Sequence, residues 1–550
     1  MDRVLKRSFR KEIVPLLLLM AAYSFIAFFN LGNTRSPLTT WSGSEAAIID
    51  LGQMQYISRF QFMMGARHNI PFTLFASADG TEWDFSMRID GGSVFAWDER
   101  PVNTYARFVQ VLPSSPGLRL QEVALRDRYD QLILPYNLFT PETETLFDEQ
   151  DLIPNSSSFM NSTYFDEIYH ARTGYEFLHG LTVLETTHPP MGKNFIALSI
   201  QAFGMTPFGW RLPGTLAGII MIPLMYIFGR MMFRSPSWGM FTAFIFAFDF
   251  MPFVQTRIAT IDSYVTLFVI ASYLCMYGFV RESLPLKKAL LWLAGSGLFM
   301  GFAIASKWQG VYAAIGLAVL FFIAWFKILK RDKKEAWTIF GCCFAFFVAV
   351  PVVVYLLSYI PFVRAMDDGS GFLATVIANQ QHMFSYHSEL TEEHPFSSRW
   401  WEWPLIIRPI FYYSNRLAEP MRQGISSFGN PAVWWVGIFA TVYAFAVLRD
   451  KEQKEHHPTV IFLLIAYAAQ FVPWMFVFRA TFIYHYFPSV PFVVLLIAFM
   501  FKNKFPRLAW AYGGVVLALF ALFYPVLSGA PVSIDFVSRF LRWFPAWILV

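Results

Sequence analysis

The chain contains a long series of apolar runs of roughly 17 to 25 residues, the length at which an α-helix crosses the hydrocarbon core of a bilayer. Of its 550 residues, 56% are hydrophobic and only 15% are charged, whereas soluble proteins carry roughly 25% charged residues. This excess of apolar side chains requires lipid as a solvent. We therefore predict a polytopic α-helical membrane protein.

Clusters of Lys and Arg recur at alternate ends of these runs, and the positive-inside rule assigns them to the cytoplasmic side. They lie at the N-terminus and at 230–234, 281–288, 327–334, 449–454 and 502–507. About eleven spans fit this assignment, with the C-terminus outside: 13–31, 211–232, 238–254, 262–280, 289–306, 310–326, 336–358, 432–448, 458–477, 487–501 and 508–527. Counting the apolar segment 193–205 as a span would reverse every later loop, so we expect it to lie flat at the outer interface.

Charge and cysteine usage exclude other classes of protein. The formal charge of +5 is accounted for by the clusters that set topology, so nucleic acid is not predicted as a partner. All three cysteines, Cys275, Cys342 and Cys343, lie inside apolar runs, so the polar segments form no disulfide, which favours a bacterial source. No small-residue cleavage site follows the run 13–31, which we interpret as an uncleaved anchor.

The polar stretch after the first span predicts β structure in its first part. Its short alternating or apolar runs lie at 46–51, 72–76, 106–112 and 122–125. Turn residues such as Asp79-Gly80 and Asp90-Gly91-Gly92 separate them, a pattern typical of a small sandwich. A connector rich in Pro, Ser and Asn follows at 152–163.

Ionisable residues gather near the outer ends of the predicted spans, where insertion costs about 2.5 to 3.5 kcal/mol each. They are Asp166, Glu167, Arg211, Arg257, Asp262, Lys307, Arg408, Arg479 and His485. Any one alone is more simply an interfacial charge or a helix-packing ion pair, but so many on one side predict a polar cavity. An acid can take the proton of an acceptor hydroxyl while Arg and Lys stabilise a departing phosphate, which suits transfer from an anionic lipid-phosphate donor.

Two further groups have simpler interpretations. The spacing of His382, His387 and His394 matches no common metal motif, so we interpret them as polar loop or pocket residues and predict no metal ligand set. Whether a divalent metal is required stays open. The group Trp400, Trp401 and Trp403 is typical of interfacial anchoring.

Several signatures of the polar stretch follow the order of one known domain. They are Trp41, Ala47 to Gly52, Ser77 to Trp83, Ala106 to Val111 and Leu120 to Val123. The region 33–128 therefore resembles the discoidin, or coagulation-factor C-type, jelly roll. The resemblance implies a carbohydrate- or lipid-binding outer module, and a structural insert without a ligand is the alternative.

The rest of the chain, about 163–550, is similar to the protein O-mannosyltransferase family of the glycosyltransferase C superfamily. The matching motifs are Phe165-Asp166-Glu167, His188-Pro189-Pro190-Met191-Gly192-Lys193, Arg211-Leu212-Pro213, Thr256-Arg257 with Asp262-Ser263, Ser306-Lys307-Trp308-Gln309-Gly310, His394-Pro395-Phe396-Ser397-Ser398, Trp400-Trp401-Glu402-Trp403-Pro404, Arg408-Pro409, Asn430-Pro431 and Tyr484-His485-Tyr486-Phe487-Pro488. A lone His-Pro-Pro would be weak, but this ordered series is specific.

The resemblance implies inverting transfer of mannose from polyprenyl-phosphate mannose to Ser or Thr hydroxyls of exported proteins, outside a bacterial plasma membrane. The lipid-linked sugar is then a donor substrate, and no cofactor is expected. The implied roles are Asp166 and Glu167 as catalytic residues, with Asp166 the base; Arg211, Arg257, Lys307 and Arg479 as donor-phosphate ligands; and His188, Asp262, Trp308, Arg408 and His485 as other site-lining residues.

Two departures from the fungal and animal pattern leave the acceptor open. The loop 361–431 is too short for the β-trefoil domain of those enzymes, and the discoidin-like insert is additional. A lipid-phosphate-sugar enzyme acting on an envelope glycan or lipid remains an alternative, as do a transporter or flippase with a sugar-binding outer domain and a membrane-anchored carbohydrate-binding protein.

These expectations divide the chain into segments. They are the cytoplasmic N-terminus and first span (1–31), the discoidin-like sandwich (33–128), a catalytic outer loop with an interfacial helix (152–210), the transmembrane core (211–358), a second large outer loop (361–431) and a C-terminal four-helix membrane region (432–550).

Overall fold

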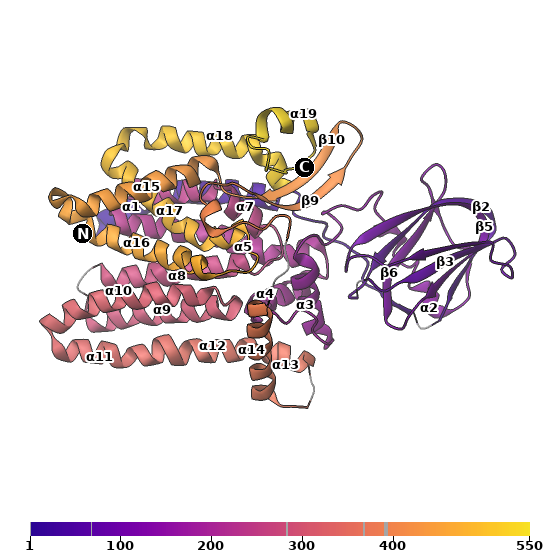
Figure 1. Ribbon diagram of the computed structural model, residues 1–550, viewed down its shortest axis with the longest axis horizontal. Helices are drawn as coiled ribbons and strands as arrows, with labels where there is room; N and C mark the ends of the chain where they lie inside the picture. Colours follow the sequence, from indigo (N-terminus) through magenta and orange to yellow (C-terminus); the bar gives the residue numbers. More distant parts are fainter. Residues whose placement is uncertain (1, 44, 68, 282–283, 367–368, 390–393) are drawn as a thin grey trace. The chain divides into compact units, whose positions relative to one another are not determined.

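The computed structural model describes the chain except for residues 1, 44, 68, 282–283, 367–368 and 390–393 (Figure 1). The described residues form two compact units. The first comprises Met1–Phe29, Gly180–Phe195 and Leu212–Val550, and the second comprises Asn30–His179 and Ile196–Arg211. Parts of the predicted outer loop 361–431, at 367–368 and 390–393, lie outside the described residues.

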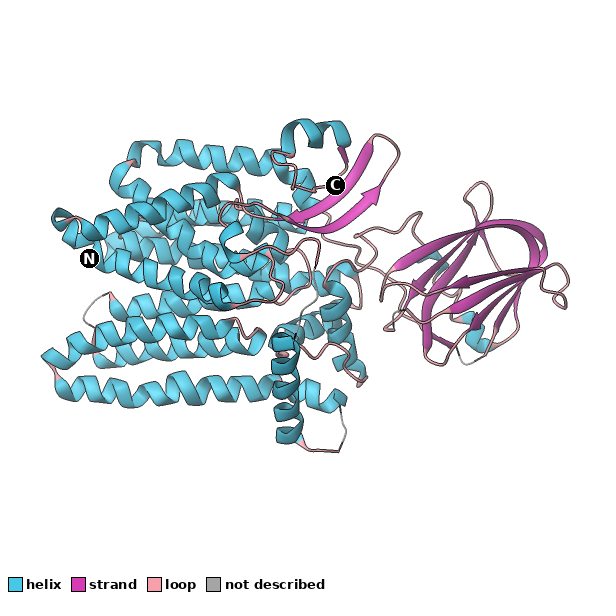
Figure 2. Ribbon diagram, viewed as in Figure 1, coloured by secondary structure: helices cyan, strands magenta, loops and turns pink. Residues whose placement is uncertain are grey.

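The first unit consists mainly of helices (Figure 2). The long apolar helices of the chain are α1 (Asp2–Phe28), α5 (Pro207–Phe233), α6 (Pro236–Ala247), α7 (Phe250–Thr256), α8 (Asp262–Val280), α9 (Leu286–Ser306), α10 (Gly310–Arg331), α11 (Lys333–Phe344), α12 (Val350–Ser358), α15 (Pro431–Arg449), α16 (His457–Phe471), α17 (Val490–Lys504) and α18 (Ala509–Ser528). A π-helical turn, Ala345–Ala349, joins α11 to α12.

The lengths of these helices confirm a multi-pass membrane protein. Within the described residues, 9 helical segments are long and apolar enough to cross a membrane, and α6 with α7, bent by 60° at their break, makes a tenth. The apolar part of α1, Glu12–Phe28, is shorter. Ten of the eleven predicted spans fall on these ten segments, whereas the first, 13–31, falls on α1, whose apolar part is too short to be counted with them.

The predicted interfacial segment 193–205 coincides with α4 (Met191–Phe203), a helix of 13 residues. At a rise of 1.5 Å per residue its length is about 20 Å, which is less than the roughly 30 Å core of a bilayer. The helix is therefore too short to cross, and its flat orientation stays a prediction.

Burial separates central from peripheral helices. The most apolar window of the segment Ile483–Lys504, which contains α17, is 100% buried, whereas that of Lys333–Met366 is 11% buried. α17 packs against α6, α15 and α16, and α8 packs against α9. The rest of the described protein therefore leaves most of the α11 and α12 surface uncovered, as expected of helices that face lipid.

Several smaller elements of the first unit lie in or near the predicted outer loops. The helices α13 (Ile360–Met366) and α14 (Phe372–Glu389) precede the hairpin of β9 (Ile410–Arg416) and β10 (Met421–Ser427). The short strand β11 (Val532–Ser533) pairs with β10, which gives the order β11-β10-β9.

The second unit contains an antiparallel β-sheet domain. Its strands are β1 (Trp41–Gly43), β2 (Ala47–Met64), β3 (Phe72–Ser77), β4 (Phe85–Ile89), β5 (Trp97–Pro113), β6 (Leu118–Arg126), β7 (Leu132–Ile133) and β8 (Asn137–Leu138). Their order is β1-β6-β2-β5-β3-β4, with β7 beside β6 and β8 beside β2. All the runs predicted as β structure fall on these strands.

The sequence pattern explains the domain's core and turns. Alternate strand residues such as Phe60, Phe62 and Phe72 point into one buried apolar cluster. Gly80 and Gly91 have φ of 81° and 83°, a region that favours glycine in turns. The structure confirms a β-sheet domain, and the discoidin assignment of 33–128 stays a prediction.

The contact of α9 with the π-helical turn provides a test of the helix packing. A Cβ added at Gly297 would overlap the backbone carbonyl of Phe346, whereas nothing lies within 4 Å of one added at Gly341. We expect Gly297→Ala to destabilise the protein by about 1–3 kcal/mol through overpacking, measured as a lower midpoint of thermal unfolding in detergent. Gly341→Ala is the matched control, and equal midpoints for the two variants would contradict this packing.

Candidate functional site

The predicted catalytic acid lies at the start of a helix in the second unit. Asp166 immediately precedes α3 (Glu167–His179), and its carbonyl accepts hydrogen bonds from the backbone N–H groups of Tyr169 and His170, at 3.0 and 3.1 Å. The preceding Phe165 has a φ of 48°, which is unusual for a bulky residue and concentrates at functional sites. Asp166 is partly exposed, whereas Glu167 is fully buried.

Glu167 and Arg211 form a buried bidentate ion pair. Arg211 Nε and Nη2 donate to Glu167 Oε1 and Oε2, both at 2.7 Å, and both side chains are 0% exposed. The planar fork of a guanidinium matches the two oxygens of a carboxylate, so this geometry fixes both side chains.

The remaining donors of Arg211 bind backbone carbonyls of the same unit. Nη1 donates to Leu31 and Phe159 at 2.8 and 2.6 Å, and Nη2 donates to Ser162 at 3.0 Å. Every N–H group of the guanidinium therefore has a protein acceptor. These bonds favour a positioning role for Arg211 over the predicted contact with a donor phosphate.

A large cavity lies in the first unit. Its volume is about 1830 Å³, which exceeds the roughly 300–1,000 Å³ of a typical small-molecule pocket. Of the predicted site residues, His188, Lys307, Trp308, Arg408 and Arg479 line it. The structure therefore gathers five predicted residues from four segments that lie far apart in the sequence.

The three cations that line the cavity differ in the ion pairs and hydrogen bonds that they form with the protein. Lys307 Nζ pairs with Asp262 Oδ1 at 2.8 Å. Arg408 donates to two backbone carbonyls at 3.2 and 3.3 Å. Arg479 makes one hydrogen bond among the described residues, from Nη1 to the carbonyl of Ala480 at 3.3 Å. Arg479 therefore keeps most of its donors for an anionic ligand.

His188 belongs to a network with a buried carboxylate. Its Nδ1 lies 3.3 Å from Glu185 Oε1 and 2.9 Å from Thr187 Oγ1. Lys193, 1% exposed, forms an ion pair with Glu185 and donates to the carbonyls of Glu185 and His188. Burial lowers the pKa of His188 against the opposing effect of Glu185, so its imidazole is neutral at pH 7.

A helix of the later outer loop supplies a second imidazole. His387 of α14 lies with Nε2 2.9 Å from the carbonyl of Thr187, and its ring centroid is 5.3 Å from that of His188. It lines the cavity together with Gln380 of the same helix, as expected of a pocket residue.

The other predicted site residues do not line this cavity. Arg257 donates to the carbonyls of Ala27 and Phe29 at 3.0 and 2.8 Å, and these bonds join α1 to the end of α7. His485 is 2% exposed and packs on Trp474, with ring centroids 4.4 Å apart. Asp262 acts through its ion pair with Lys307.

Polar residues outside the predicted set also line the cavity. Trp308 Nε1 donates to the hydroxyl of Tyr355 at 3.1 Å, and that hydroxyl donates to Gln380 Oε1 at 2.6 Å. No motif marks Tyr355 or Gln380, because one lies in an apolar run and the other in a loop helix. Gln380 and His387 are polar residues of α14 that lie seven positions apart. This spacing would have indicated that the two side chains share one face of the helix.

One acidic trio is close enough to hold a metal ion among the residues that the structure describes. Its members are Glu122, Asp148 and Glu149 of the second unit. Glu122 accepts bonds from Gln150 Nε2 at 2.6 Å and from the backbone N–H of Glu149 at 3.1 Å, and burial raises its pKa to about 8. A carboxyl that is protonated at neutral pH is a poor metal ligand.

Family models match most of the membrane region. Residues 200–363 match the model of dolichyl-phosphate-mannose-protein mannosyltransferase. Residues 372–547 match the model of the C-terminal four-transmembrane region of protein O-mannosyltransferase. Neither match includes the β-sheet domain or the residues around Asp166.

Curated relatives and a solved structure agree with these models. The chain is 26% identical to a polyprenol-phosphate-mannose–protein mannosyltransferase of Mycolicibacterium smegmatis, over 70% of this chain and 87% of the relative. It is also 26% identical to one of Mycobacterium tuberculosis, over 73% and 86%. The protein O-mannosyltransferase Pmt1-Pmt2 complex of Saccharomyces cerevisiae, solved with its sugar donor, has the same fold, with a TM-score of 0.63, 13% identity, and 70% and 89% coverage.

The surroundings of His387 predict a pH effect. Burial, and then the charges of His188 and Arg479, lower its pKa from 6.5 to about 4. The unfolded chain therefore binds this proton at higher pH than the native protein, so stability falls as the pH drops from about 6.5 towards 4. We expect His387→Gln to lose less stability than the parent over this window, measured by thermal unfolding at stepped pH.

The control for this prediction lies on the same helix. His382 is exposed on α14, so His382→Gln is expected to follow the parent. A pH dependence of parental size in His387→Gln would contradict the assignment.

Proposed function

We propose that the chain, whose residues 200–363 and 372–547 match models of protein O-mannosyltransferases, transfers mannose from polyprenyl-phosphate mannose to Ser or Thr hydroxyls of exported proteins. The observation that carries the proposal is the cavity of the first unit, which combines Arg479, whose donors are largely unused, with a long apolar wall. The enzyme is a glycosyltransferase embedded in the membrane.

The two kinds of cavity lining suit the two parts of a lipid-linked donor. Met300 and Ile304 of α9, Val311 of α10, and Val348 and Val352 on the segment around the π-helical turn line its apolar side. A prenyl chain is bound by such apolar surface. Arg479, with Lys307 beside it, supplies the positive charge that a phosphodiester requires.

The polar wall adds groups suited to a sugar. Trp308, Tyr355 and Gln380 form a hydrogen-bonded series beside the neutral His188 and His387. Uncharged donors and acceptors fix the orientation of hydroxyls without competing for the phosphate. We propose that this wall faces the mannosyl group.

The reaction needs a base for the acceptor and positive charge for the leaving phosphate. Asp166 is proposed to take the proton of the Ser or Thr hydroxyl as its oxygen bonds to the anomeric carbon and the bond to the phosphate oxygen breaks. The lipid phosphate leaves as an anion, stabilised by Arg479 and Lys307. One displacement inverts the anomeric centre, so no covalent enzyme intermediate forms.

The carboxylate of Glu167 is already paired with another residue. Both oxygens of this carboxylate are engaged by Arg211 through hydrogen bonds, which fix its position. We therefore propose Asp166 as the base and Glu167 as the residue that holds it in place.

The remaining assignments extend the same proposal. We propose that the enzyme resides in a bacterial plasma membrane with its catalytic side extracytoplasmic, as the positions of the basic clusters support. We also propose that the sandwich 33–128 is discoidin-like and binds carbohydrate. The proposed domain boundaries are those inferred from the sequence. Its antiparallel strands and aromatic core support that architecture.

Removing the proposed base tests the reaction. We expect Asp166→Asn to lower the kcat of mannosyl transfer from polyprenyl-phosphate mannose to a Ser/Thr-rich peptide by roughly 10²–10⁴-fold, the usual contribution of a general base. The dissociation constant for polyprenyl phosphate should stay unchanged, because Asp166 is proposed to act on the acceptor hydroxyl and not to bind the phosphate. Asp151→Asn, at an exposed acid just before the connector, is the control.

The outcome also separates the alternatives. Transfer by Asp166→Asn at the parental rate would refute the role of this residue. Label recovered in glycan or lipid, with none in the peptide, would refute the protein acceptor.

Removing the available cation tests donor binding. We expect Arg479→Ala to weaken binding of polyprenyl phosphate by roughly tenfold or more, because a charge-assisted hydrogen bond contributes about 1.5–3 kcal/mol. Binding is measured by titration of the purified protein in nanodiscs. Arg364→Ala, an exposed cation of α13 that does not line the cavity, is the control. Parental affinity in Arg479→Ala would place the phosphate elsewhere.

A further inference from the structure

The β-sheet domain contacts the residues that lead directly into the catalytic motif. Thr163 donates from its backbone N–H to the carbonyl of Phe95 at 3.1 Å and from its hydroxyl to the carbonyl of Val94. Trp97 donates from its backbone N–H to Ser162 Oγ at 3.0 Å. Ser162 and Thr163 are 4% and 7% exposed, so these bonds are shielded from water.

The loop that makes these contacts, Gly92–Trp97, is itself fixed to the sheet. Phe95 donates to the carbonyl of Met64 at 3.0 Å, and Met64 donates to the carbonyl of Ala96 at 3.2 Å. Phe95 has a φ of 48°, a backbone conformation that bulky residues adopt only when their surroundings impose it. Its ring packs on Tyr175 of α3, with centroids 5.0 Å apart.

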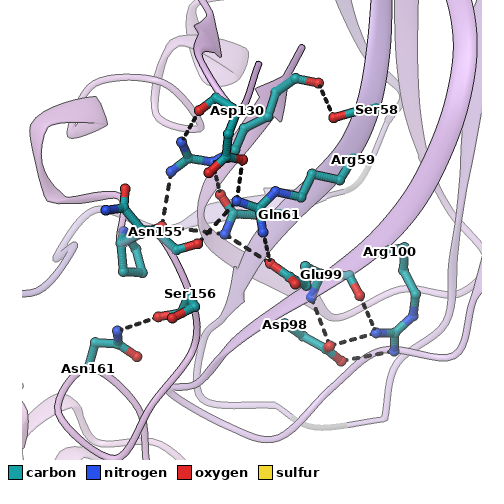
Figure 3. A network of polar contacts seen from close by, with 12 residues as sticks. Ser58, Arg59, Gln61, Asp98, Glu99, Arg100, Asp130, Asn155, Ser156 and Asn161 are labelled. Carbon is teal, nitrogen blue, oxygen red and sulfur yellow. Dashed lines mark hydrogen bonds and ion pairs between the residues drawn. The ribbon is translucent and has the colours of Figure 1, made fainter. Parts of the chain in front are cut away.

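The connector before the motif is tied to the same sheet (Figure 3). Arg126 donates to the carbonyl of Pro154 at 3.0 Å, and Arg59 donates to that of Asn155 at 3.1 Å. Asn161 closes a turn by donating to the carbonyl of Ser156 at 3.0 Å. The path from the sheet to Ser162 is therefore held along its length.

The other side of the motif is anchored by Arg211. This guanidinium bonds both the carbonyl of Ser162 and the carboxylate of Glu167. Asp166 thus lies between two fixed points, Thr163 on the sheet loop and Glu167 on the ion pair. Few backbone torsions remain between them to absorb a displacement.

We propose that the loop Gly92–Trp97 of the β-sheet domain positions Asp166 for catalysis, so that this domain is part of the catalytic scaffold. The inference rests on the proposed function, in which Asp166 is the base. Thr163 and Phe95 are positioning residues, because they act through the backbone of the motif and touch no substrate. A misplacement of a catalytic group by about 1 Å can cost roughly 10²-fold in rate.

The test compares two substitutions of one side chain in the full-length protein. Thr163→Val keeps the shape and the backbone bond but removes the hydroxyl that binds Val94, whereas Thr163→Ser keeps the hydroxyl. We expect Thr163→Val to lower kcat by roughly tenfold or more, with KM for the donor and the dissociation constant for polyprenyl phosphate unchanged. Thr163→Ser should restore most of the kcat.

A second variant keeps the test decisive if Thr163→Val does not fold. Phe95→Leu removes the ring contact with Tyr175 and should also lower kcat while donor affinity is retained. Arg88→Ala, at an exposed ion pair of β4, is the control within the domain and should retain the parental kcat.

Each outcome decides one question. Parental kcat in Thr163→Val or in Phe95→Leu would overturn the positioning role, and so would equal losses in Thr163→Val and Thr163→Ser. A parallel loss of kcat and donor affinity would also overturn it, by indicating general destabilisation. A parent that transfers no mannose would refute the proposed function itself, whereas a parent that transfers and an inactive Asp166→Asn leave that function standing.

Discussion

The buried guanidinium of Arg211 is the interaction on which the second unit depends. A charge removed from water is tolerated only when its hydrogen bonds and its countercharge are supplied by the protein. Here Glu167 supplies the countercharge, and the carbonyls of Leu31, Phe159 and Ser162 complete the set. One side chain therefore joins the residues after α1, the connector and the start of α3.

In the first unit, buried charges are balanced in a different way. Lys307 is balanced by Asp262, and Lys193 by Glu185, so each of these buried ammonium groups has its own carboxylate. Arg479 has only a backbone acceptor among the described residues. The charge of Arg479 is therefore less engaged by groups of the protein than the charges of Lys307 and Lys193.

The elements with strong physical constraints were predictable from the sequence. Apolar length determined the spans, and alternation with Gly turns determined strands such as β2 and β5. The ionisable residues were correctly identified as unusual, but their partners were not, because an ion pair such as Glu167 with Arg211 joins positions that no local pattern relates. Arg257 shows the same limit, since it caps the end of α7 and its side chain bonds the carbonyls of Ala27 and Phe29 at the end of α1. Gln380 and Tyr355 were not predicted as cavity residues, because uncharged polar residues in a loop helix or an apolar run are common.

The two units alternate along the chain, and this has a consequence for biosynthesis. The second unit begins at Asn30 but is completed only by Ile196–Arg211, after the chain has passed through Gly180–Phe195 of the first. A ribosome makes Glu167 well before Arg211, so this ion pair can form only after the beginning of α5 (Pro207–Phe233) has been synthesised. The segments that Arg211 holds together, from Leu31 to Glu167, can therefore reach their final conformation only late in the synthesis of the second unit.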